Sequence, residues 1–266
     1  MKLLFVGDVV GRPGRRILQR LLHGLIDAHR IDYVVVNVEN AAGGIGVNPA
    51  VLKELDALPI DCYSSGNHIW DKREGLPLLS QGSPIERRPI LRPANYPSGN
   101  PGSGLHIGET ASGIPVAVIN LEGRVYMKDL DSPFVIADQL LEQVGQDVRV
   151  IMVDFHAEAT SEKQAMGFHL DGRVSAVFGT HTHVPTADER ILTEGTAFIT
   201  DVGMTGPYEG VIGFRPNKVM QRFLLQRNIS LDVAKRDVRL AGAVVDIDEA
   251  TGKARHLERL LIPMPE

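Results

Sequence analysis

Carboxylate, amide and imidazole side chains directly follow five apolar segments of this chain. The segments and the polar residues that end them are "LLFVG" with Asp8, "VVVNV" with Glu39 and Asn40, "CYSSG" with Asn67 and His68, "VIMVDF" with His156, and "SAVFGT" with His181 and His183. Each ending alone has an ordinary explanation, because Asp and Asn are common helix caps and a lone histidine is more often structural than a ligand. All five together are hard to explain as caps, so the pattern predicts one shared site.

The residue types in this set indicate transition-metal chemistry. Three imidazoles, two carboxylates and two amide oxygens are mixed nitrogen and oxygen ligands, which suit iron, manganese or zinc better than calcium or magnesium. The set is too large for one four-coordinate ion but sufficient for two ions that share a bridging carboxylate. Two such ions, roughly 3.5–4 Å apart, are the usual clamp for phosphoryl transfer, in which a metal-activated hydroxide attacks phosphorus. His68, beside Asn67, then has the type and place of a proton donor to the leaving group.

The elements that must position these residues alternate between strand-like and helix-like segments. Apolar runs predict strands at 2–6, 32–38, 60–65, 115–121, 148–155, 174–179 and 196–202, and two further strands around a "TGK" turn within 242–262. Helical spacing predicts helices at 14–30, 48–58, 132–145 and 217–227, with Asn48 as an N-cap and Pro49 at the first helical position. Continuous apolar strands separated by helices predict an α/β layered fold, whose strand ends form the ligand-binding edge.

The spacing of the two final histidines supports the shared site. If the strand at 174–179 continues through "HTH", His181 and His183 point the same way, because residues two apart on a strand share a face. The Gly-, Pro- and Ser-rich stretch from Gly82 to Gly113 is interpreted as a long surface excursion within one domain that spans residues 1–266.

Composition limits the partners. The 266 residues carry a net charge of −5, so no overall basic field attracts nucleic acid, and a stable nucleic-acid partner is not expected. Cys62 is the single cysteine, which fits a reducing compartment, and the apolar N-terminal run ends at Asp8, too early for a signal or membrane segment. We therefore expect a cytoplasmic protein without a membrane partner that acts on a small molecule, with a homo-oligomer left open.

A dinucleotide-binding reading competes for the N-terminal segment. The stretch "VGDVVGRPG" has glycines between a strand and a helix, and Glu39 ends the next strand. Its spacing is G-x-x-x-G-x-x-G, however, whereas the dinucleotide fingerprint is G-x-G-x-x-G. Asp8 would repel a pyrophosphate, and the histidines would have no role, so the metal site is the better interpretation.

The blocks that carry these residues resemble the calcineurin-like metallophosphoesterase superfamily. They read "GDVVG", "NVENAAGG", "GNHIWD", "DFHAEATSEK" and "GTHTHVPTAD". Two departures from the superfamily pattern are visible: Val10 stands where a histidine is usual, and Glu39, followed by Asn40, stands where the bridging aspartate is usual. With "TDVGMTGP", these departures resemble the YmdB-like branch, a group of bacterial cyclic-nucleotide phosphodiesterases, and that similarity extends over essentially the whole chain.

The resemblance implies a fold, a ligand set and a reaction. The fold is a sandwich of two β-sheets flanked by helices. One ion would be held by Asp8, Glu39, Asn40 and His183, and the other by Glu39, Asn67, His156 and His181, with His68 as the proton donor. The metals implied are two iron ions, with manganese or zinc as alternatives, and the substrates implied are 2′,3′-cyclic nucleotides such as 2′,3′-cAMP.

Supporting roles and rival functions remain open at this point. Asp71 or Asp154 could orient a ligating imidazole, Arg12 and Arg215 could contact a substrate phosphate, and Tyr208 and Phe214 could stack on a base, although each has an ordinary structural role as the alternative. A regulatory protein that uses the metal site to sense a nucleotide is one rival function. A phosphomonoesterase or nuclease that uses the same site is the other.

Overall fold

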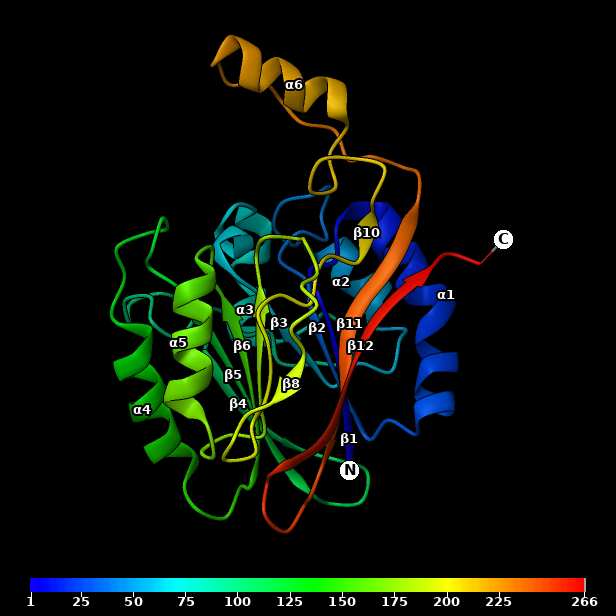
Figure 1. Ribbon diagram of the computed structural model, residues 1–266. Helices are drawn as coiled ribbons and strands as arrows, with labels where there is room; N and C mark the ends of the chain where they lie inside the picture. Colours follow the sequence, from blue (N-terminus) through cyan, green and yellow to red (C-terminus); the bar gives the residue numbers. More distant parts are fainter. Residues whose placement is uncertain (266) are drawn as a thin grey trace.

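Two β-sheets form the centre of the computed structural model, which describes residues 1–265 (Figure 1). The first sheet has the strand order β10-β11-β1-β2-β3, with β12 paired to β11. Its strands are β1 (Lys2–Val6), β2 (Tyr33–Asn37), β3 (Cys62–Ser64), β10 (Gly206–Pro207), β11 (Val238–Ile247) and β12 (Ala254–Pro263). The second sheet has the order β4-β5-β6-β7-β9-β8. Its strands are β4 (Leu105–Glu109), β5 (Pro115–Glu122), β6 (Val150–His156), β7 (Ala176–Thr180), β8 (Arg190–Ile191) and β9 (Ala197–Ile199).

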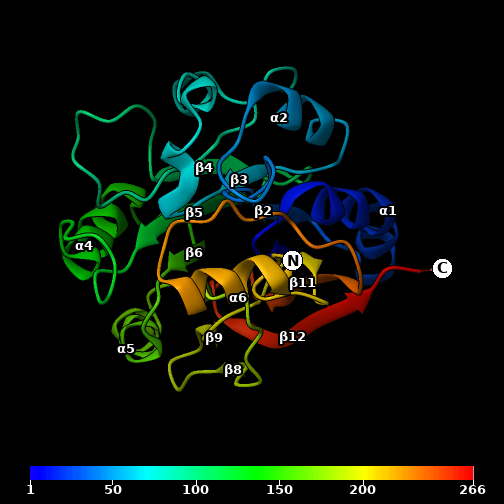
Figure 2. The same cartoon turned by 90° about the horizontal axis from the view of Figure 1, so that it is seen from above.

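Helices cover the outer face of each sheet. The helices are α1 (Gly11–His29), α2 (Pro49–Leu55), α3 (Leu78–Gln81), α4 (Pro133–Val144), α5 (Thr160–Leu170) and α6 (Pro216–Leu225), and two short 3₁₀ turns span Asn67–Trp70 and Arg73–Gly75. Ile17 and Leu18 of α1 pack with Leu4 and Val6 of β1, whereas α4 and α5 share a separate core with β5 and β6. Figures 1 and 2 show α1 and α2 on one side of the molecule and α4 and α5 on the other, with α6 extending across the top.

A third core fills the space between the two sheets. Leu3 and Phe5 of β1 point into it, whereas Leu4 and Val6 point to the helical side. The rings of Phe5 and Phe178 stack with their centroids 5.5 Å apart, which joins the first sheet to the second. Because both faces of the central strands are covered, their sequences are continuously apolar and do not alternate.

Strand direction places the candidate residues on one edge. The strands β1, β2 and β3 run parallel to one another, as do β5, β6, β7 and β9. The backbone amide of His181, after β7, donates to Oδ2 of Asp8, after β1, at 3.2 Å. The carboxyl ends of the two parallel groups therefore meet, which is the ligand-binding edge expected of α/β sheets.

The layered α/β fold predicted from the sequence is confirmed, and several local expectations need adjustment. The structure confirms the helix cap at Asn48, whose Oδ1 accepts from Val51 N at 2.9 Å. The first helix begins at Gly11, three residues before the predicted start. The surface interpretation of residues 82–113 is wrong in part, because Ile90 and Leu91 are buried and β4 adds an edge strand there. Among residues 1–265, no helix combines the length and apolar composition needed to cross a bilayer.

Candidate metal centre

The structure brings the seven predicted ligand residues to the junction of the two sheets. Asp8, Glu39 and Asn40 follow β1 and β2, and Asn67 lies at the start of the first 3₁₀ turn, after β3. His156 ends β6 of the second sheet, and His181 and His183 follow β7. Gly66 permits the close approach of Asn67 to the second sheet, because a Cβ atom at this position would lie 2.2 Å from the ring of His156.

Potential ligand atoms form two overlapping groups around Glu39. One group contains Glu39, His156 and His181, and the other contains Asp8, Glu39 and His183; within each, the ligand atoms lie within 4.8 Å of one another. In the first group, Nε2 of His156 lies 2.9 Å from Oδ1 of Asn67, 3.3 Å from Oε1 of Glu39 and 3.0 Å from Nδ1 of His181. Potential ligand atoms of three other side chains thus surround Nε2 of His156.

Each imidazole is held through the nitrogen that faces away from these groups. Nδ1 of His156 donates to Oγ1 of Thr180 at 2.9 Å, because that hydroxyl uses its own hydrogen to donate to Asp154 at 2.7 Å. Nδ1 of His183 donates to the carbonyl of Ile212 at 3.0 Å, and Nε2 of His181 lies 3.1 Å from a carboxylate oxygen of Glu158. The other nitrogen of each ring faces the cluster, which is the arrangement usual for metal-binding histidines.

The oxygen atoms of the site lack the partners that buried oxygen atoms require. Within residues 1–265, Oδ1 of Asp8, Oε1 of Glu39 and Oδ1 of Asn40 are buried without a hydrogen-bond donor. The amide nitrogen of Asn40 donates to the carbonyl of Gly44 at 3.2 Å, so its oxygen is the atom that points inward. Buried acceptors are normally satisfied, and a cation would satisfy all three. The residues present therefore fit a metal centre.

Burial and mutual charge shift the pKa values across the site. Burial raises the pKa of Asp8 well above its usual value. Burial also opposes the charged forms of Glu39 and His156, but their attraction for each other outweighs it, so the pKa of Glu39 falls to about 2 and that of His156 rises to about 9. Burial, and then the charge of His156, lower the pKa of His181 to about 3, which keeps His181 neutral and able to bind a cation.

His181 and His183 both reach the site, but the expectation that strand geometry orients them is wrong. The strand β7 ends at Thr180, so strand alternation does not orient His181 and His183. Both residues adopt left-handed backbone conformations, with φ values of 99° and 65°. Non-glycine residues in this region are strained, and such strain is kept only where surrounding contacts hold it. Thr182 between them is held by Asp201, whose Oδ2 accepts from the Thr182 amide at 3.2 Å and from its hydroxyl at 2.7 Å.

His68 lies beside the ligand groups but does not belong to either of them. It lines a pocket of about 360 Å³ together with Glu39, His181 and His183. Its backbone amide donates to Oε2 of Glu39 at 3.1 Å, and its Nδ1 lies 2.7 Å from Oδ2 of Asp71. The side chain of His68 is 35% exposed, so the imidazole can meet a ligand that enters the pocket.

The supporting residues are distributed differently from the sequence expectation. Asp71 contacts His68 and not a ligand histidine, whereas Asp154 reaches His156 through Thr180. Phe214 lines the pocket of the metal centre, but Tyr208 does not, because its hydroxyl donates to the carbonyl of Met204 and Arg239 covers its ring. Arg12 and Arg215 lie together in a neighbouring pocket.

Sequence reasoning missed three further residues of this region. Thr180 connects Asp154 to His156, and Asp201 holds Thr182 and pairs with Lys163. Glu122 ends β5 and lies opposite His156 in the strand register, fully buried, with neither carboxylate oxygen hydrogen-bonded within the described part of the chain. Its pKa is raised by burial. Glu122 and Thr180 were detectable by the same signal as the ligands, a polar residue at the end of an apolar strand.

Comparison with known proteins gives one consistent result. A family model described as "YmdB-like protein" matches residues 4–260. A Bacillus subtilis (strain 168) protein named 2′,3′-cyclic-nucleotide 2′-phosphodiesterase is 44% identical over 262 residues, which cover 98% of this chain and 97% of that protein. A Mycoplasma pneumoniae protein named putative phosphatase/phosphodiesterase is 34% identical, with 98% of this chain and 93% of that protein covered.

Two solved structures share the whole fold. A hypothetical protein from Thermus thermophilus superposes with a TM-score of 0.91 at 39% identity, covering 100% of both chains. A structure described as a novel phosphatase from Mycoplasma pneumoniae gives a TM-score of 0.91 at 33% identity, covering 99% of this chain and 93% of the other. Similarity at this level and coverage shows that the fold is shared over the whole chain.

Proposed function

Because the chain belongs to the YmdB-like protein family, a branch of the calcineurin-like metallophosphoesterases, we propose that it is a metal-dependent phosphodiesterase that hydrolyses 2′,3′-cyclic nucleotides. The observation that carries the proposal is the convergence of potential ligand atoms around Nε2 of His156, beside the buried oxygens of Asp8, Glu39 and Asn40 that lack a hydrogen-bond donor. Buried carboxylate and amide oxygens that lack donors are suited to cations and, through them, to the oxygens of a phosphate.

Two transition-metal ions would be held by residues that meet at Glu39. Asp8, Asn40 and His183 would hold one ion, and Asn67, His156 and His181 the other, with the Glu39 carboxylate shared. Iron is the metal we propose, with manganese or zinc as the alternatives, because three imidazoles favour first-row transition metals. When bound, such ions act as Lewis acids that polarise the phosphate and lower the pKa of water.

His68 would donate the proton that the leaving group needs. Hydrolysis forms a bond between phosphorus and a water oxygen and breaks one ester P–O bond, and the alkoxide released must be protonated. Asp71 holds Nδ1 of the His68 ring, so Nε2 is the atom that carries this proton. Opening a 2′,3′-cyclic phosphate at the 2′ oxygen leaves a 3′-phosphomonoester as the product.

A substrate panel on protein of known metal content tests the proposal. We expect 2′,3′-cAMP to turn over faster than 3′-AMP, and the Asn67→Ala variant, which removes a proposed ligand, to lose activity together with metal. Faster release of phosphate from 3′-AMP would instead support the phosphatase function in the name of the Mycoplasma pneumoniae relative. No turnover of any phosphate ester by fully loaded protein would support the regulatory alternative.

The setting of the protein belongs to the same proposal. We infer a cytoplasmic enzyme with one domain over residues 1–266 that acts on a small phosphodiester. The single cysteine agrees with a reducing compartment. A measurement of mass in solution tests whether copies of the chain associate.

A further inference from the structure

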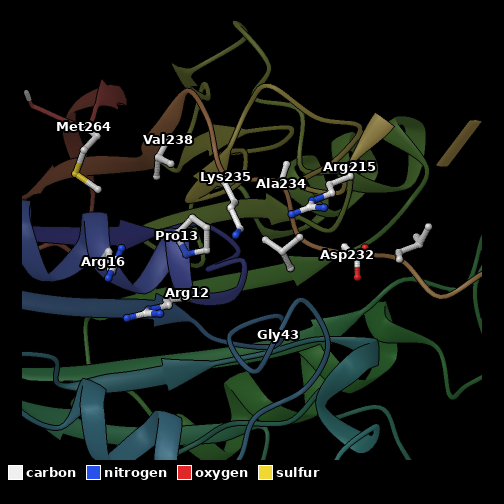
Figure 3. Close-up of a pocket in the computed structure, with 12 residues that line it drawn as sticks. Arg12, Pro13, Arg16, Gly43, Arg215, Asp232, Ala234, Lys235, Val238 and Met264 are labelled. Carbon is white, nitrogen blue, oxygen red and sulfur yellow. The ribbon is translucent and has the colours of Figure 1, made fainter. Parts of the chain in front are cut away.

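A second pocket, larger than the one at the metal centre, is lined by cationic side chains. Its volume is about 870 Å³, and Arg12, Arg16, Arg215 and Lys235 line it with Asp232 as their carboxylate neighbour. Figure 3 shows Arg12 and Arg16 on α1, with Arg215 and Lys235 on other segments of the chain and the loop at Gly43 between. Arg215 directly precedes α6 and Lys235 follows it, so three segments distant in sequence build this basic pocket.

The four cations of the basic pocket have no partners of their own. Within the described residues 1–265, none of their side chains takes part in an ion pair or a hydrogen bond to the protein. Arg15, which lies between Arg12 and Arg16 on the same helix, shows the contrast, because its Nε pairs with Glu54 at 2.8 Å. In a chain with a net charge of −5, this gathering of unpaired positive charge on one cavity is a local feature of the fold.

All four cationic side chains are solvent-exposed, and an anion bound among them would offset their mutual repulsion. Arg12 and Arg16 are four residues apart on α1, so their like charges repel along one helix face. They also lie near the start of the helix, whose first turn has no acidic residue and whose dipole disfavours cations. A bound phosphate would relieve both effects, and guanidinium groups are suited to bidentate contacts with phosphate oxygens.

The basic pocket adjoins the pocket at the metal centre. Leu231 lines both pockets. Gly43 and Arg215 line the basic pocket, and their chain neighbours Gly44 and Phe214 line the pocket at the metal centre. The pocket at the metal centre, about 360 Å³, is at the small end of the roughly 300–1,000 Å³ range of ligand sites. A ligand that fills this pocket and continues past Leu231 would reach the cations.

We propose that the basic pocket binds phosphate groups of a nucleotide ligand, and that this ligand is an extension of the substrate, a short oligonucleotide ending in a 2′,3′-cyclic phosphate. The inference rests on the proposed function for the identity of the terminal group but not for the existence of the pocket. The lining contains no aromatic side chain, so recognition would depend on phosphate charge and not on stacking of a base. A separate nucleotide bound beside the substrate offers the same chemistry, and the experiment distinguishes the two sources.

Calorimetric titration of the metal-loaded protein tests the pocket without depending on turnover. The probes are 3′-AMP and the dinucleotide ApA with a 3′-terminal phosphate, which adds one internucleotide phosphate. We expect the dinucleotide to bind at least roughly tenfold more tightly, since hydrogen bonds between charged partners are the strong ones. The Arg12→Ala/Arg16→Ala double variant should lose this gain in dinucleotide affinity. Two single variants give a matched comparison. Arg16→Ala should reduce the gain, whereas Arg20→Ala, which removes an exposed arginine of α1 outside the pocket, should keep it.

The outcomes separate the sources and the two proposals. Two equivalents of 3′-AMP bound by wild type and one by the double variant, without a dinucleotide gain, would assign the pocket to a separate nucleotide and overturn the extended substrate. The pocket would be overturned as a phosphate site by either of two results. In one, the dinucleotide binds more tightly than 3′-AMP to the same extent in wild type and double variant; in the other, both proteins show no such gain and bind one equivalent of 3′-AMP. Loss of the gain in the variant, together with no hydrolysis of cyclic phosphates by wild type, would retain the pocket and reject the proposed function.

Discussion

Replacing Asp201 with alanine tests how the fold holds the two final histidines of the metal centre. Oδ2 of Asp201 accepts from Nζ of Lys163 at 2.7 Å and from the hydroxyl and amide of Thr182, while Oδ1 accepts from the Gly203 amide at 2.8 Å. Asp201 and Lys163 are each only 1% exposed. The Asp201→Ala variant would leave a buried ammonium group without a partner and release Thr182.

The magnitude follows from burial. Removing one partner of a buried ion pair costs roughly 3–5 kcal/mol in the free energy of unfolding. A chain of 266 residues unfolds with an entropy of about 0.56 kcal/mol/K, at about 2.1 cal/mol/K per residue, so the melting temperature should fall by roughly 5–9 °C. The left-handed residues on either side of Thr182 cost about 1–3 kcal/mol each, and once Thr182 is released that strain can relax. Relaxation would turn His181 and His183 from the site, so metal affinity should fall by at least roughly tenfold.

The control is Lys163→Met, which removes the ion pair but keeps the contacts of Asp201 with Thr182 and Gly203. Both variants should melt at lower temperature, but only Asp201→Ala should also lose metal. Thermal unfolding and competition for metal with a chelator at 25 °C measure the two effects separately. Equal metal loss in the two variants would refute the reasoning, because it would mean that the loss follows general destabilisation and not the release of residues 181–183.

Three further predictions concern the metal centre and its proton donor. Glu39→Ala should lose both ions, whereas His183→Ala should weaken mainly one; elemental analysis measures both, and equal losses would contradict a shared Glu39. His68→Ala should keep its metal but lose roughly 10²–10⁴-fold in turnover of 2′,3′-cAMP. Its loss should be much smaller on an aryl phosphodiester, whose leaving group needs no proton, and equal losses on both substrates would argue against proton donation. Asp71→Asn should reduce turnover less than His68→Ala and leave metal content unchanged, so metal loss in this variant would place Asp71 among the residues that support the ligands.

The residue types of the site and the order of the elements that carry them were readable from the sequence. Apolar runs that end in Asp8, Glu39, Asn67 and His156 predict strands whose polar ends share one edge, because parallel strands deliver their carboxyl ends together. The helix start at Asn48 was readable for a similar reason, since the cap is a contact between residues three apart. Local chemistry and regular periodicity decide such features, so one sequence is enough to predict them.

The tertiary structure decided what depends on contacts between distant segments. The backbone of His181 and His183 is left-handed because Asp201, almost twenty residues away, holds Thr182, and no periodicity in "HTH" reports that contact. The helix α5 was not predicted for a related reason. It buries Lys163 against Asp201, so a charged residue stands where helical periodicity would require an apolar one.

Of the features described, the basic pocket was the least predictable from the sequence. Arg12 and Arg16 share a helix, but Arg215 and Lys235 reach the same cavity only because the segments on either side of α6 pack against the start of α1. Each arginine, read alone in the sequence, is an ordinary solvent-exposed side chain. Only the packing of those segments brings the four charges to one cavity. Apolar neighbours such as Val233 and Ala234 fix the path of the chain, because their packing outweighs the repulsion between the charges.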